Sequence, residues 1–437
     1  MFPRPKNLDV ISMLYGIIGS TTHLSLLRDE NMRSSHQPIR LFLIVLCALV
    51  LAGAVGGEYP RASAPPMRVV GYLASWGVRN KGTSIANLPA KHLTHIFYAF
   101  AEIAPDGSVT LGNRCVDVGA CDSGASLPRV AGGNFGELLR LKSRYPHLRL
   151  AISIGGWGGS ARFSDAALND ASRRRFAASA IDLFIRRWLG LFDGIDIDWE
   201  FPVEGGLKGN VERPEDKQNF TLLLSELRRE LDAQGQRDKR HYELTIAASA
   251  RPAEIANLEV QKIIPLLDFI NVMTYDYHTG FRYAHFNAPL YAVANDPTPD
   301  LTIDSTMRVF SNSGVPAQKL LIGIPFFARA FGGVANLNGG LLQPAPTPPR
   351  DWRDSDGDWR RVAATRLHNP RYVRHWEKKA RVPWLYDSTS KNWISYDDPE
   401  SVRAKMDYVR EHGYGGVVIW ELGADDGQLM RAIAGEK

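Results

Sequence analysis

Cysteine is scarce in this chain, with three residues in a total of 437. Cys47 lies in an apolar N-terminal run, whereas Cys115 and Cys121 share one short segment that contains no histidine and no further cysteine. Without such partners, this pair lacks the ligand set of a zinc site. An even pair in an exported protein favours a local disulfide between Cys115 and Cys121, and two free thiols are the alternative.

Long apolar runs are also lacking. The run Leu41–Leu51 follows Arg40 and is shorter than the roughly 20 residues that a transmembrane helix needs. Its length fits the apolar core of a signal peptide, and a cleavage site follows at residues 52–54. We therefore predict a secreted protein, extracellular or periplasmic, cleaved after Ala54 and without stable membrane association. An uncleaved membrane anchor is the alternative.

A strong charge imbalance is a third absence, since 52 Lys and Arg residues accompany 47 Asp and Glu residues, for a net charge of +5. Basic residues occur in twos and threes among acidic ones, as at Arg173–Arg175, Arg228-Arg229 and Lys378-Lys379. We interpret them as solvated helix surfaces and expect no nucleic-acid partner. With 44% hydrophobic and 10% aromatic residues, the chain can bury a large core.

The most informative segment is Asp193–Glu200, in which acidic and apolar residues alternate. Successive side chains of a strand point to opposite faces, so Asp196, Asp198 and Glu200 lie on one side. Neighbours on that side are ~6.6 Å apart, where two charges at an effective dielectric constant near 20 repel by about 2.5 kcal/mol. Together with burial, this repulsion predicts that at least one acid holds a proton near neutral pH, as general acid catalysis requires.

A solvated edge strand would show the same alternation. Here the flanking residues are apolar, with Leu189, Leu191 and Phe192 before the run and Phe201-Pro202 after it. An interior strand is therefore the interpretation that we prefer. Carboxylates inside a protein are costly unless they have a function.

Short apolar runs separated by helix-like stretches predict a parallel sheet with helices outside it. The eight strand-like runs are Val69–Trp76, Thr94–Phe100, Leu148–Ile154, Gly194–Glu200, Tyr242–Ala248, Phe269–Met273, Leu320–Pro325 and Gly416–Trp420. The clearest helix-like stretches are Phe135–Arg144, Ser172–Trp188, Asp216–Leu231, Thr302–Asn312 and Ser401–Glu411. This pattern fits an α/β fold, the (β/α)8 TIM barrel, whose chemistry lies at the C-terminal ends of the strands. We expect Glu200 at the mouth, with Asp198 and then Asp196 deeper.

One connection is too long for a simple crossover. The segment between strands 7 and 8 is rich in Pro, Gly and Asp, and it contains the aromatic residues Trp352, Trp359, Tyr372, Trp376, Trp384 and Tyr386. We predict a small α+β insertion domain over 332–393, because a floppy loop would not carry so many tryptophans. The expected organisation is an N-terminal extension with a signal peptide (1–54), a linker (55–66), a catalytic barrel (67–331 and 394–437) and this insertion.

The run that ends at Glu200 resembles the DxxDxDxE signature of glycoside hydrolase family 18, the chitinase family. Further segments resemble the family's other motifs in the same order, namely Ser153–Trp157, Met273–Asp276, Gly323–Arg329, Trp393–Asp398 and Trp420. The likeness extends from about Val69 to Met430. Departures are Phe327 and Ala328, which replace a tyrosine and a glycine, and Phe201, where many members have tyrosine.

The resemblance implies a chitinase that hydrolyses β-1,4 N-acetylglucosamine linkages with retention of configuration. The substrate's own acetamido oxygen would attack and form an oxazolinium intermediate. Glu200 would act as general acid and base, and Asp198 would orient the acetamido group. Asp196 would share a proton with Asp198, and Tyr275 would hydrogen-bond the acetamido carbonyl.

The resemblance also predicts the residues that bind the substrate, which are Tyr72, Phe100, Gly156, Trp157, Met273, Asp276, Arg329 and Trp420. For Tyr72 and Phe100, a role as buried barrel aromatics is the alternative. Asp193 lies an odd number of residues before Asp196, so its side chain does not share the face of the three acids. We expect Asp193 and Ser153 to be structural.

Three other functions stay open at this point. A carbohydrate-binding lectin on the same barrel usually lacks the terminal glutamate that Glu200 supplies. An endo-β-N-acetylglucosaminidase on other N-acetylhexosamine glycans would share the chemistry, although the insertion favours a linear chain such as chitin. A metal-dependent enzyme would need histidines at strand ends, where only His95 and His278 occur, and we interpret these two as structural or rim residues. We therefore expect no metal, no organic cofactor, chitin or chito-oligosaccharides as the partner, and a monomer.

Overall fold

The computed structural model describes residues 67–80, 82–122, 126–280, 282–349 and 351–436. The predicted signal peptide, its cleavage site and the linker lie outside these ranges. Within them, no helix is both long enough and apolar enough to cross a membrane.

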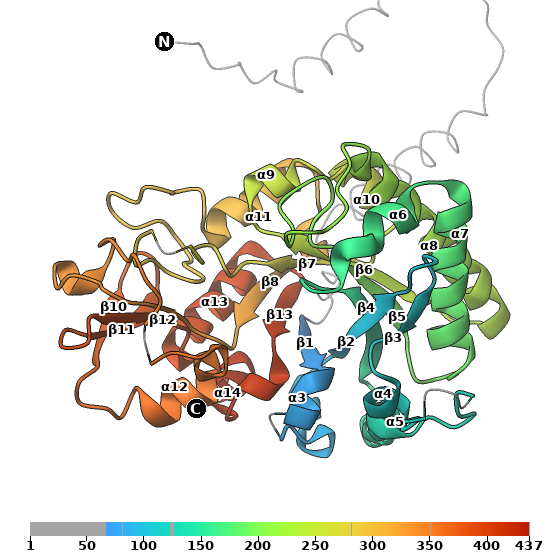
Figure 1. Cartoon of the computed structure of the whole chain (residues 1–437), viewed down its shortest axis with the longest axis horizontal. Helices are drawn as coiled ribbons and strands as arrows, with labels where there is room; N and C mark the ends of the chain where they lie inside the picture. The colour runs from blue at the N-terminus through green and yellow to red at the C-terminus, as the bar shows by residue number, and fades with distance from the viewer. Residues whose placement is uncertain (1–66, 81, 123–125, 281, 350, 437) are drawn as a thin grey trace, which may run out of the picture. The chain divides into compact units, whose positions relative to one another are not determined.

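Eight parallel strands form a closed barrel (Figure 1). They are β1 (Arg68–Ala74), β2 (His95–Ile103), β4 (Arg149–Gly155), β5 (Gly194–Asp198), β6 (Glu243–Ser249), β7 (Phe269–Met273), β8 (Leu320–Pro325) and β13 (Gly416–Trp420). The sheet closes because β1 pairs with β13 on one side and with β2 on the other. The predicted barrel is thus confirmed, and Glu200 lies just beyond the end of β5.

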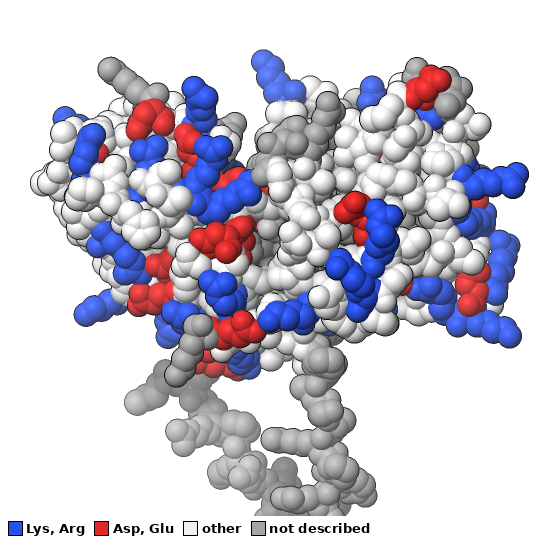
Figure 2. All heavy atoms as spheres, turned by 90° about the horizontal axis from the view of Figure 1, so that it is seen from below, with Lys and Arg blue, Asp and Glu red and all other residues white. Residues whose placement is uncertain are grey.

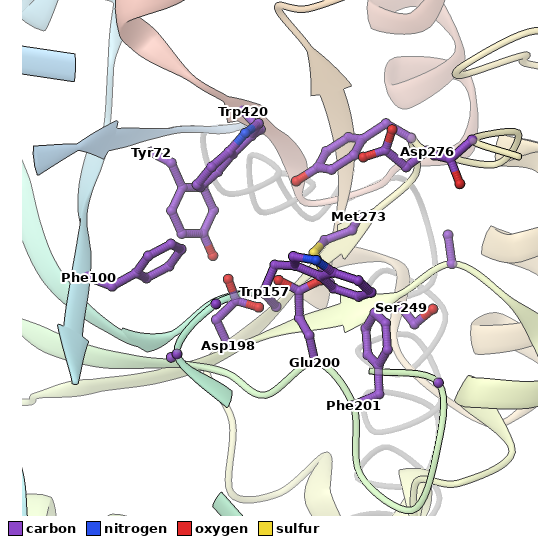
Figure 3. Close-up of a pocket in the computed structure, with 18 of the residues that line it drawn as sticks. Tyr72, Phe100, Trp157, Asp198, Glu200, Phe201, Ser249, Met273, Asp276 and Trp420 are labelled. Atoms are coloured by element: carbon purple, nitrogen blue, oxygen red, sulfur yellow. The ribbon is translucent and has the colours of Figure 1, made fainter. Parts of the chain in front are cut away.

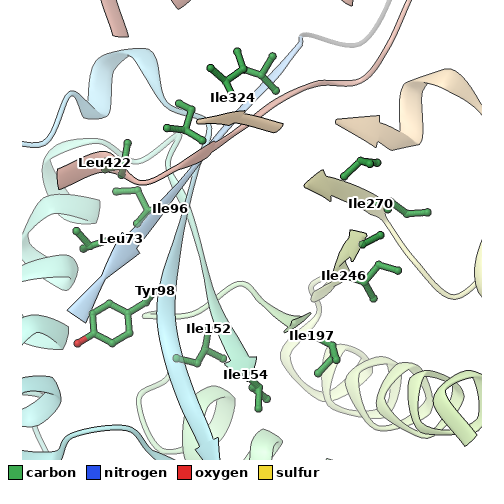
Figure 4. Packing of buried hydrophobic residues seen from close by; sticks show 14 of the residues in the cluster. Leu73, Ile96, Tyr98, Ile152, Ile154, Ile197, Ile246, Ile270, Ile324 and Leu422 are labelled. Atoms are coloured by element: carbon green, nitrogen blue, oxygen red, sulfur yellow. The ribbon is translucent and has the colours of Figure 1, made fainter. Parts of the chain in front are cut away.

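Both faces of the barrel strands are buried, as expected for a parallel sheet with helices outside it. The inner face carries a cluster formed by Val70, Tyr72, Phe97, Ala99, Ala151, Phe269, Leu321 and Val418. The outer face carries mainly aliphatic residues, among them Leu73, Ile96, Ile152, Ile197, Ile246 and Ile270, which Figure 4 shows. Since apolar side chains fill much of the interior, the acids of β5 are an exception that needs partners.

The helices alternate with the strands along the chain. They are α3 (Ser75–Asn80), α4 (Arg114–Val118), α5 (Gly133–Arg144), α6 (Phe163–Ala167), α7 (Asp170–Ala180), α8 (Asp216–Asp238), α9 (Pro252–Ile255), α10 (Val260–Ile263), α11 (Ile303–Asn312), α12 (Trp359–Thr365), α13 (Pro399–His412) and α14 (Gln428–Ile433). Side chains of Asn169, Thr302 and Asp398 accept backbone N–H groups at the starts of α7, α11 and α13. The helix predicted over 172–188 continues past α7 as a π-helical segment, Ile181–Arg186.

The insertion contains a four-stranded antiparallel sheet in the order β10-β11-β12-β9. Its strands are β9 (Arg329–Phe331), β10 (Val373–Glu377), β11 (Val382–Asp387) and β12 (Asn392–Ser395). The small α+β unit is therefore present between β8 and β13, as predicted. Its sheet begins with β9, before the predicted boundary at residue 332, and ends two residues after 393.

The apolar core of the insertion includes a segment that precedes it in sequence. Ala284, Phe286 and Val293, from the loop between β7 and α11, cluster with residues such as Trp384 and Trp393. The backbone reinforces this contact, because Ala284 N–H donates to the carbonyl oxygen of residue 343 at 2.9 Å. The loop after β7 is thus part of the insertion's core, which the sequence did not predict.

A short hairpin follows β2. The strand β3 (Val109–Leu111) pairs antiparallel with the end of β2, and α4 follows directly. Cys115 and Cys121 form a disulfide, which confirms the predicted pairing.

Basic residues on the helices have acidic neighbours, as the sequence predicts. Arg228 lies 2.6 Å from Asp232, and Arg229 lies 2.6 Å from Glu226. Over the face shown in Figure 2, blue Lys and Arg side chains are interspersed with red Asp and Glu side chains. This face carries no broad patch of one sign.

Candidate active site

A cleft of about 1080 Å³ opens at the C-terminal ends of the barrel strands (Figure 3). Most of the predicted site residues line it, namely Tyr72, Phe100, Trp157, Asp198, Glu200, Met273, Tyr275, Asp276, Arg329 and Trp420. They come from β1, β2, β5, β7, β9 and β13, and from the loops that follow β4, β5 and β7. The barrel therefore brings together side chains that are far apart in the sequence.

Asp196 lies fully buried below the cleft and accepts four hydrogen bonds. The Tyr72 hydroxyl and the Ser153 hydroxyl donate to its Oδ2, each at 2.7 Å. Thr245 Oγ1 at 2.7 Å and Asn271 Nδ2 at 3.3 Å donate to its Oδ1. Burial raises the pKa of Asp196, whereas these four donors favour its charged form and oppose the rise.

Asp198 is also buried, but its surroundings differ. Its Oδ1 has no hydrogen-bond partner among the described residues. Burial, followed by the nearby charges of Glu200 and Asp196, raises the pKa of Asp198 well above its ordinary value. The described residues show no hydrogen bond between Asp196 and Asp198, so the proton that we expected them to share stays a prediction.

Glu200 carries the proton that a general acid needs. Burial, followed by the negative charges of Asp276 and Glu254, raises its pKa to about 8. At neutral pH the carboxyl is therefore mainly protonated and faces the cleft. The sequence-based prediction of a protonated acid in this strand agrees with these shifts.

Two polar residues hold the backbone of Glu200 in place, and the sequence did not reveal either of them. The Glu200 N–H donates to Ser160 Oγ at 2.9 Å, and Asn210 Nδ2 donates to the Glu200 carbonyl oxygen at 3.0 Å. The Ser160 hydroxyl also bonds the Gly156 carbonyl oxygen at 2.9 Å. Ser160 begins a short 3-10 helix, Ser160–Arg162, and Asn210 lies in a loop. Neither segment carries a periodic sequence signal.

Gly156 does not line the cleft, although we predicted that it binds substrate. Its φ is +79°, and a Cβ at this position would lie 2.4 Å from the ring of Phe100. Glycine is required here because any side chain would displace that ring. Gly156 thus makes room for Phe100, and its contact with the substrate stays a prediction.

Aromatic rings form one wall of the cleft (Figure 3). Phe100 and Trp420 are stacked, with ring centroids 5.8 Å apart, and Tyr72 lies 5.5 Å from Trp420. Trp76, at the start of α3, is 6.1 Å from Phe100 and remains 42% exposed. Trp157 is 49% exposed. Exposed indoles in a cleft are suited to stacking on a ligand, and Trp76 is a lining residue that the sequence-based prediction missed.

Asp276 and Arg329 bind each other as well as lining the cleft. The Arg329 guanidinium donates two hydrogen bonds to the Asp276 carboxylate, at 2.5 and 2.8 Å. The ring of Phe327 lies 4.7 Å from the guanidinium carbon and 5.7 Å from the ring of Tyr275. The phenylalanine that departs from the family pattern therefore supports both neighbours through ring contacts.

Several other residues line the cleft without having been predicted. They include Ser75, Glu102, Asn113, Ser249, Arg251, Glu254, Thr279 and Trp352. Arg251 donates to the carbonyl oxygens of Asp276 and Tyr277, at 2.9 and 3.0 Å, which fixes the loop after β7. Ser249 donates a hydrogen bond to Glu254.

Asp193 lies at the opposite end of β5 from the cleft. It accepts hydrogen bonds from Lys142 Nζ at 2.6 Å, from Leu150 N–H at 2.8 Å and from Arg240. This arrangement fits the structural role that we predicted for Asp193.

The two histidines near strand ends have protein partners. His95 Nε2 lies 3.1 Å from Glu243, and His278 contacts the Phe286 carbonyl oxygen and the Thr298 hydroxyl at 2.8 and 2.9 Å. No group of three or more His, Cys, Asp or Glu residues in the described ranges is arranged to hold a metal ion.

Comparison with known proteins identifies the family. The sequence profile of glycosyl hydrolases family 18 matches residues 68–425, which covers the barrel and the insertion. The chain belongs to this family. It is therefore a glycoside hydrolase.

The chain is also similar in sequence and in fold to individual proteins of this family. The chain is 36% identical to Chitinase A1 of Niallia circulans over 408 residues, an alignment that covers 84% of this chain and 58% of that protein. Among solved structures, chitinase ChiA74 from Bacillus thuringiensis has a TM-score of 0.77 at 35% identity, covering 85% of this chain and 70% of that one. A family 18 N-acetylglucosaminidase from Paenibacillus barengoltzii has a TM-score of 0.72 at 33% identity, covering 84% and 99%.

Proposed function

We propose that this family 18 hydrolase is a secreted chitinase that cleaves β-1,4 linkages between N-acetylglucosamine units with retention of configuration. The observation that carries the proposal is the state of the two acids at the cleft. Glu200, with a pKa of about 8, is a proton donor at neutral pH. Burial and the nearby charges of Glu200 and Asp196 raise the pKa of Asp198 well above its ordinary value, which disfavours the carboxylate form that a nucleophile needs. The nucleophile is then expected to come from the substrate, as its acetamido oxygen.

The proposed reaction proceeds in two steps. Glu200 transfers its proton to the glycosidic oxygen while the acetamido carbonyl oxygen attacks the anomeric carbon, which breaks the glycosidic bond and forms an oxazolinium ion. Asp198 orients the acetamido N–H, and the Tyr275 hydroxyl donates to the carbonyl oxygen. The Glu200 carboxylate then removes a proton from water, whose oxygen attacks the same carbon. This attack breaks the bond between the anomeric carbon and the acetamido oxygen, restores the acetamido group and leaves Glu200 protonated again.

The decisive test is Glu200→Gln, which keeps the shape of the side chain and removes its proton transfer. Hydrolysis of chitin oligosaccharides should fall by at least about a hundredfold, because general acid–base catalysis contributes that much or more. Glu137→Gln on α5, whose side chain does not line the cleft, is the matched control. If Glu200→Gln retained a large share of the activity, the assignment of the acid would be wrong.

Two product measurements address the substrate-assisted route. Proton NMR of the first products should show the β anomer, and an α product would indicate inversion. Fully deacetylated chitosan should not be cleaved, because it lacks the acetamido oxygen. Rapid cleavage between two glucosamines would contradict the proposal.

Activity should also persist in EDTA, since the proposed chemistry uses no metal and no organic cofactor.

Export and oligomeric state are further parts of the proposal. Export rests on the apolar run Leu41–Leu51 and the site before Val55, which lie outside the described residues. Edman sequencing of protein secreted by a producing cell should start at Val55. Light scattering should give the mass of a monomer.

The similarity to an N-acetylglucosaminidase favours a second candidate, which is removal of single sugars from chain ends. The same acid and the same nucleophile would serve it, so the two candidates differ only in where the chain is cut. Product analysis on end-labelled chitin oligomers of defined length separates them. A spread of internal cuts would support the chitinase, and release of monosaccharide alone would support the alternative.

A further inference from the structure

The turn that follows β7 holds Asp276 in an unusual backbone conformation. The φ of Asp276 is +57°, in the left-handed region that residues other than glycine seldom occupy. A residue stays in that region when the surrounding structure holds it there, and such residues are frequent at active sites. Asp276 lines the cleft, and its negative charge contributes to the raised pKa of Glu200. The contacts that hold this turn therefore affect the acid.

Each polar group of Asp276 has a partner, and the partners come from different parts of the chain. The carboxylate accepts the two hydrogen bonds from Arg329 of β9 that are described above. The Asp276 N–H donates to Asn287 Oδ1 at 2.9 Å, and its carbonyl oxygen accepts a hydrogen bond from Arg251 at 2.9 Å. The side chain is thus held by the insertion's sheet, and the backbone is held by Asn287 and Arg251.

Asn287 lies in the loop between β7 and α11 and is 1% exposed. Its Nδ2 donates to the Phe327 carbonyl oxygen at 3.3 Å, and its N–H donates to Ser395 Oγ, on β12, at 2.7 Å. Its own carbonyl oxygen accepts the Tyr277 N–H at 3.2 Å. One buried residue therefore connects the turn after β7 to the segment after β8 and to the insertion. An aliphatic side chain in its place would leave the Asp276 N–H without this acceptor.

Arg251 contacts the same turn from the end of another barrel strand, since it follows β6 and precedes α9. Its guanidinium donates to the carbonyl oxygens of Asp276 and Tyr277, and its N–H donates to the Ser249 hydroxyl at 3.1 Å. Hydrogen bonds from a charged donor are stronger than those from a neutral one. The end of β6 thus holds the turn at the end of β7 and fixes its place on the barrel.

We propose that Asn287 and Arg251 are positioning residues that hold Asp276 in the left-handed turn and keep its carboxylate in a fixed place relative to Glu200. Neither of them transfers a proton, and both act on the reaction through Asp276. The inference rests on the proposed chitinase function, because that function makes Glu200 the acid on which the charge of Asp276 acts.

The first test removes the two contacts one at a time. Asn287→Ala removes the acceptor of the Asp276 N–H, and Arg251→Met removes the donor to its carbonyl oxygen while keeping a long side chain. Each variant should lower kcat/KM on chitohexaose by at least about tenfold, because small misplacements of groups in an active site have effects of this size or larger. Arg251→Lys keeps a charged donor and should recover most of the activity.

A double-mutant cycle distinguishes positioning from a general loss of structure. In an Asp276→Asn background the carboxylate is already absent, so Asn287→Ala and Arg251→Met should each lower kcat/KM by less than about threefold. An equal loss in both backgrounds would mean that the two residues only stabilise the fold, and it would overturn the proposal. The matched control is Asn134→Ala on α5, which removes another buried amide, one that donates to the Tyr98 hydroxyl at 2.9 Å. This control should keep the kcat/KM of the wild type.

The second test does not depend on activity. Amide hydrogen exchange of the peptide that contains Asp276 should be faster in Asn287→Ala and in Arg251→Met than in the wild type. Asn134→Ala should leave it unchanged, and unchanged exchange in both of the other variants would overturn the proposal. If the wild type cleaved no chitin oligosaccharide, the proposed function would fail, and the exchange rates would still decide whether the turn is held as described. Arg251 is half-buried, so its variants keep both tests valid even if Asn287→Ala does not fold.

Discussion

At the scale of residues, the environments of the three acids on β5 differ from one another. Asp196 is surrounded by four donors, Asp198 Oδ1 has none among the described residues, and Glu200 faces the cleft. Burial is the largest cause of the raised pKa in all three cases. The four donors favour the charged form of Asp196, whereas a pKa of about 8 keeps the Glu200 carboxyl mainly protonated at neutral pH. The proton for catalysis is therefore available at the cleft.

The charge of Glu254 should set part of the pH dependence. Because Glu254 raises the pKa of Glu200, Glu254→Gln lowers it, and the active protonated form of Glu200 is then lost at a lower pH. In the wild type, kcat/KM should decline as the pH rises through about 8. The alkaline limb of the variant should lie at lower pH.

This experiment uses pH profiles of kcat/KM on one soluble oligosaccharide. Glu137→Gln, away from the cleft, should keep the profile of the wild type. An unchanged or raised alkaline pKa in Glu254→Gln would contradict the electrostatic account.

The shared face of Asp196, Asp198 and Glu200 was predictable from the sequence, because alternate side chains of a strand point to the same face. Their partners were not predictable. Tyr72 and Thr245 reach Asp196 from strands far away in sequence, and only the register of the closed barrel brings them within 2.7 Å. The motif that contains Gly156 likewise did not reveal that the absence of a side chain there makes room for the ring of Phe100.

At the scale of elements, the insertion depends on the loop between β7 and α11. Phe286 from this loop is fully buried, with its ring centroid 5.6 Å from that of Trp393 and 5.7 Å from that of Trp384. Periodicity could predict the barrel strands and several helices, since each has a local pattern. It could not predict this contact, because a loop without a regular pattern supplies part of another unit's core.

Phe286→Ala should therefore destabilise the insertion as much as the loss of a buried aromatic side chain from the insertion's own strands. Loss of a buried phenylalanine typically costs about 3–5 kcal/mol of unfolding free energy. Val373→Ala on β10, which is 56% exposed, should change it by less than about 0.5 kcal/mol. Denaturant titration with tryptophan fluorescence measures both variants, and a loss below about 1 kcal/mol in Phe286→Ala would show that the loop is not part of this core.

At the scale of the whole molecule, the proton donor lowers the stability of the fold at high pH. The pKa of Glu200 is about 8 in the folded chain against an ordinary value of 4.5. The folded state thus binds the proton more tightly than the unfolded state. The free energy of unfolding therefore falls as the pH rises from about 4.5 to about 8, because the unfolded chain loses this proton in that range while the folded chain keeps it.

Glu200→Gln should remove this loss. Its free energy of unfolding should match that of the wild type near pH 4.5 and exceed it by roughly 2–4 kcal/mol at pH 8. Urea titrations at several pH values measure the difference, with Glu137→Gln as the control that should show none. A difference that did not grow with pH would mean that Glu200 is not buried as described.

The pairing of Asp276 with Arg329 has a consequence for the insertion. Arg329 is the first residue of β9, so the cation that neutralises Asp276 belongs to the insertion's sheet. The charge of Asp276 in turn helps to hold the proton on Glu200. A displacement of β9 that separated the pair would leave this charge uncompensated and tighten the hold on the proton. Mutations deep in the insertion should therefore shift the pH optimum of turnover even when they touch no substrate.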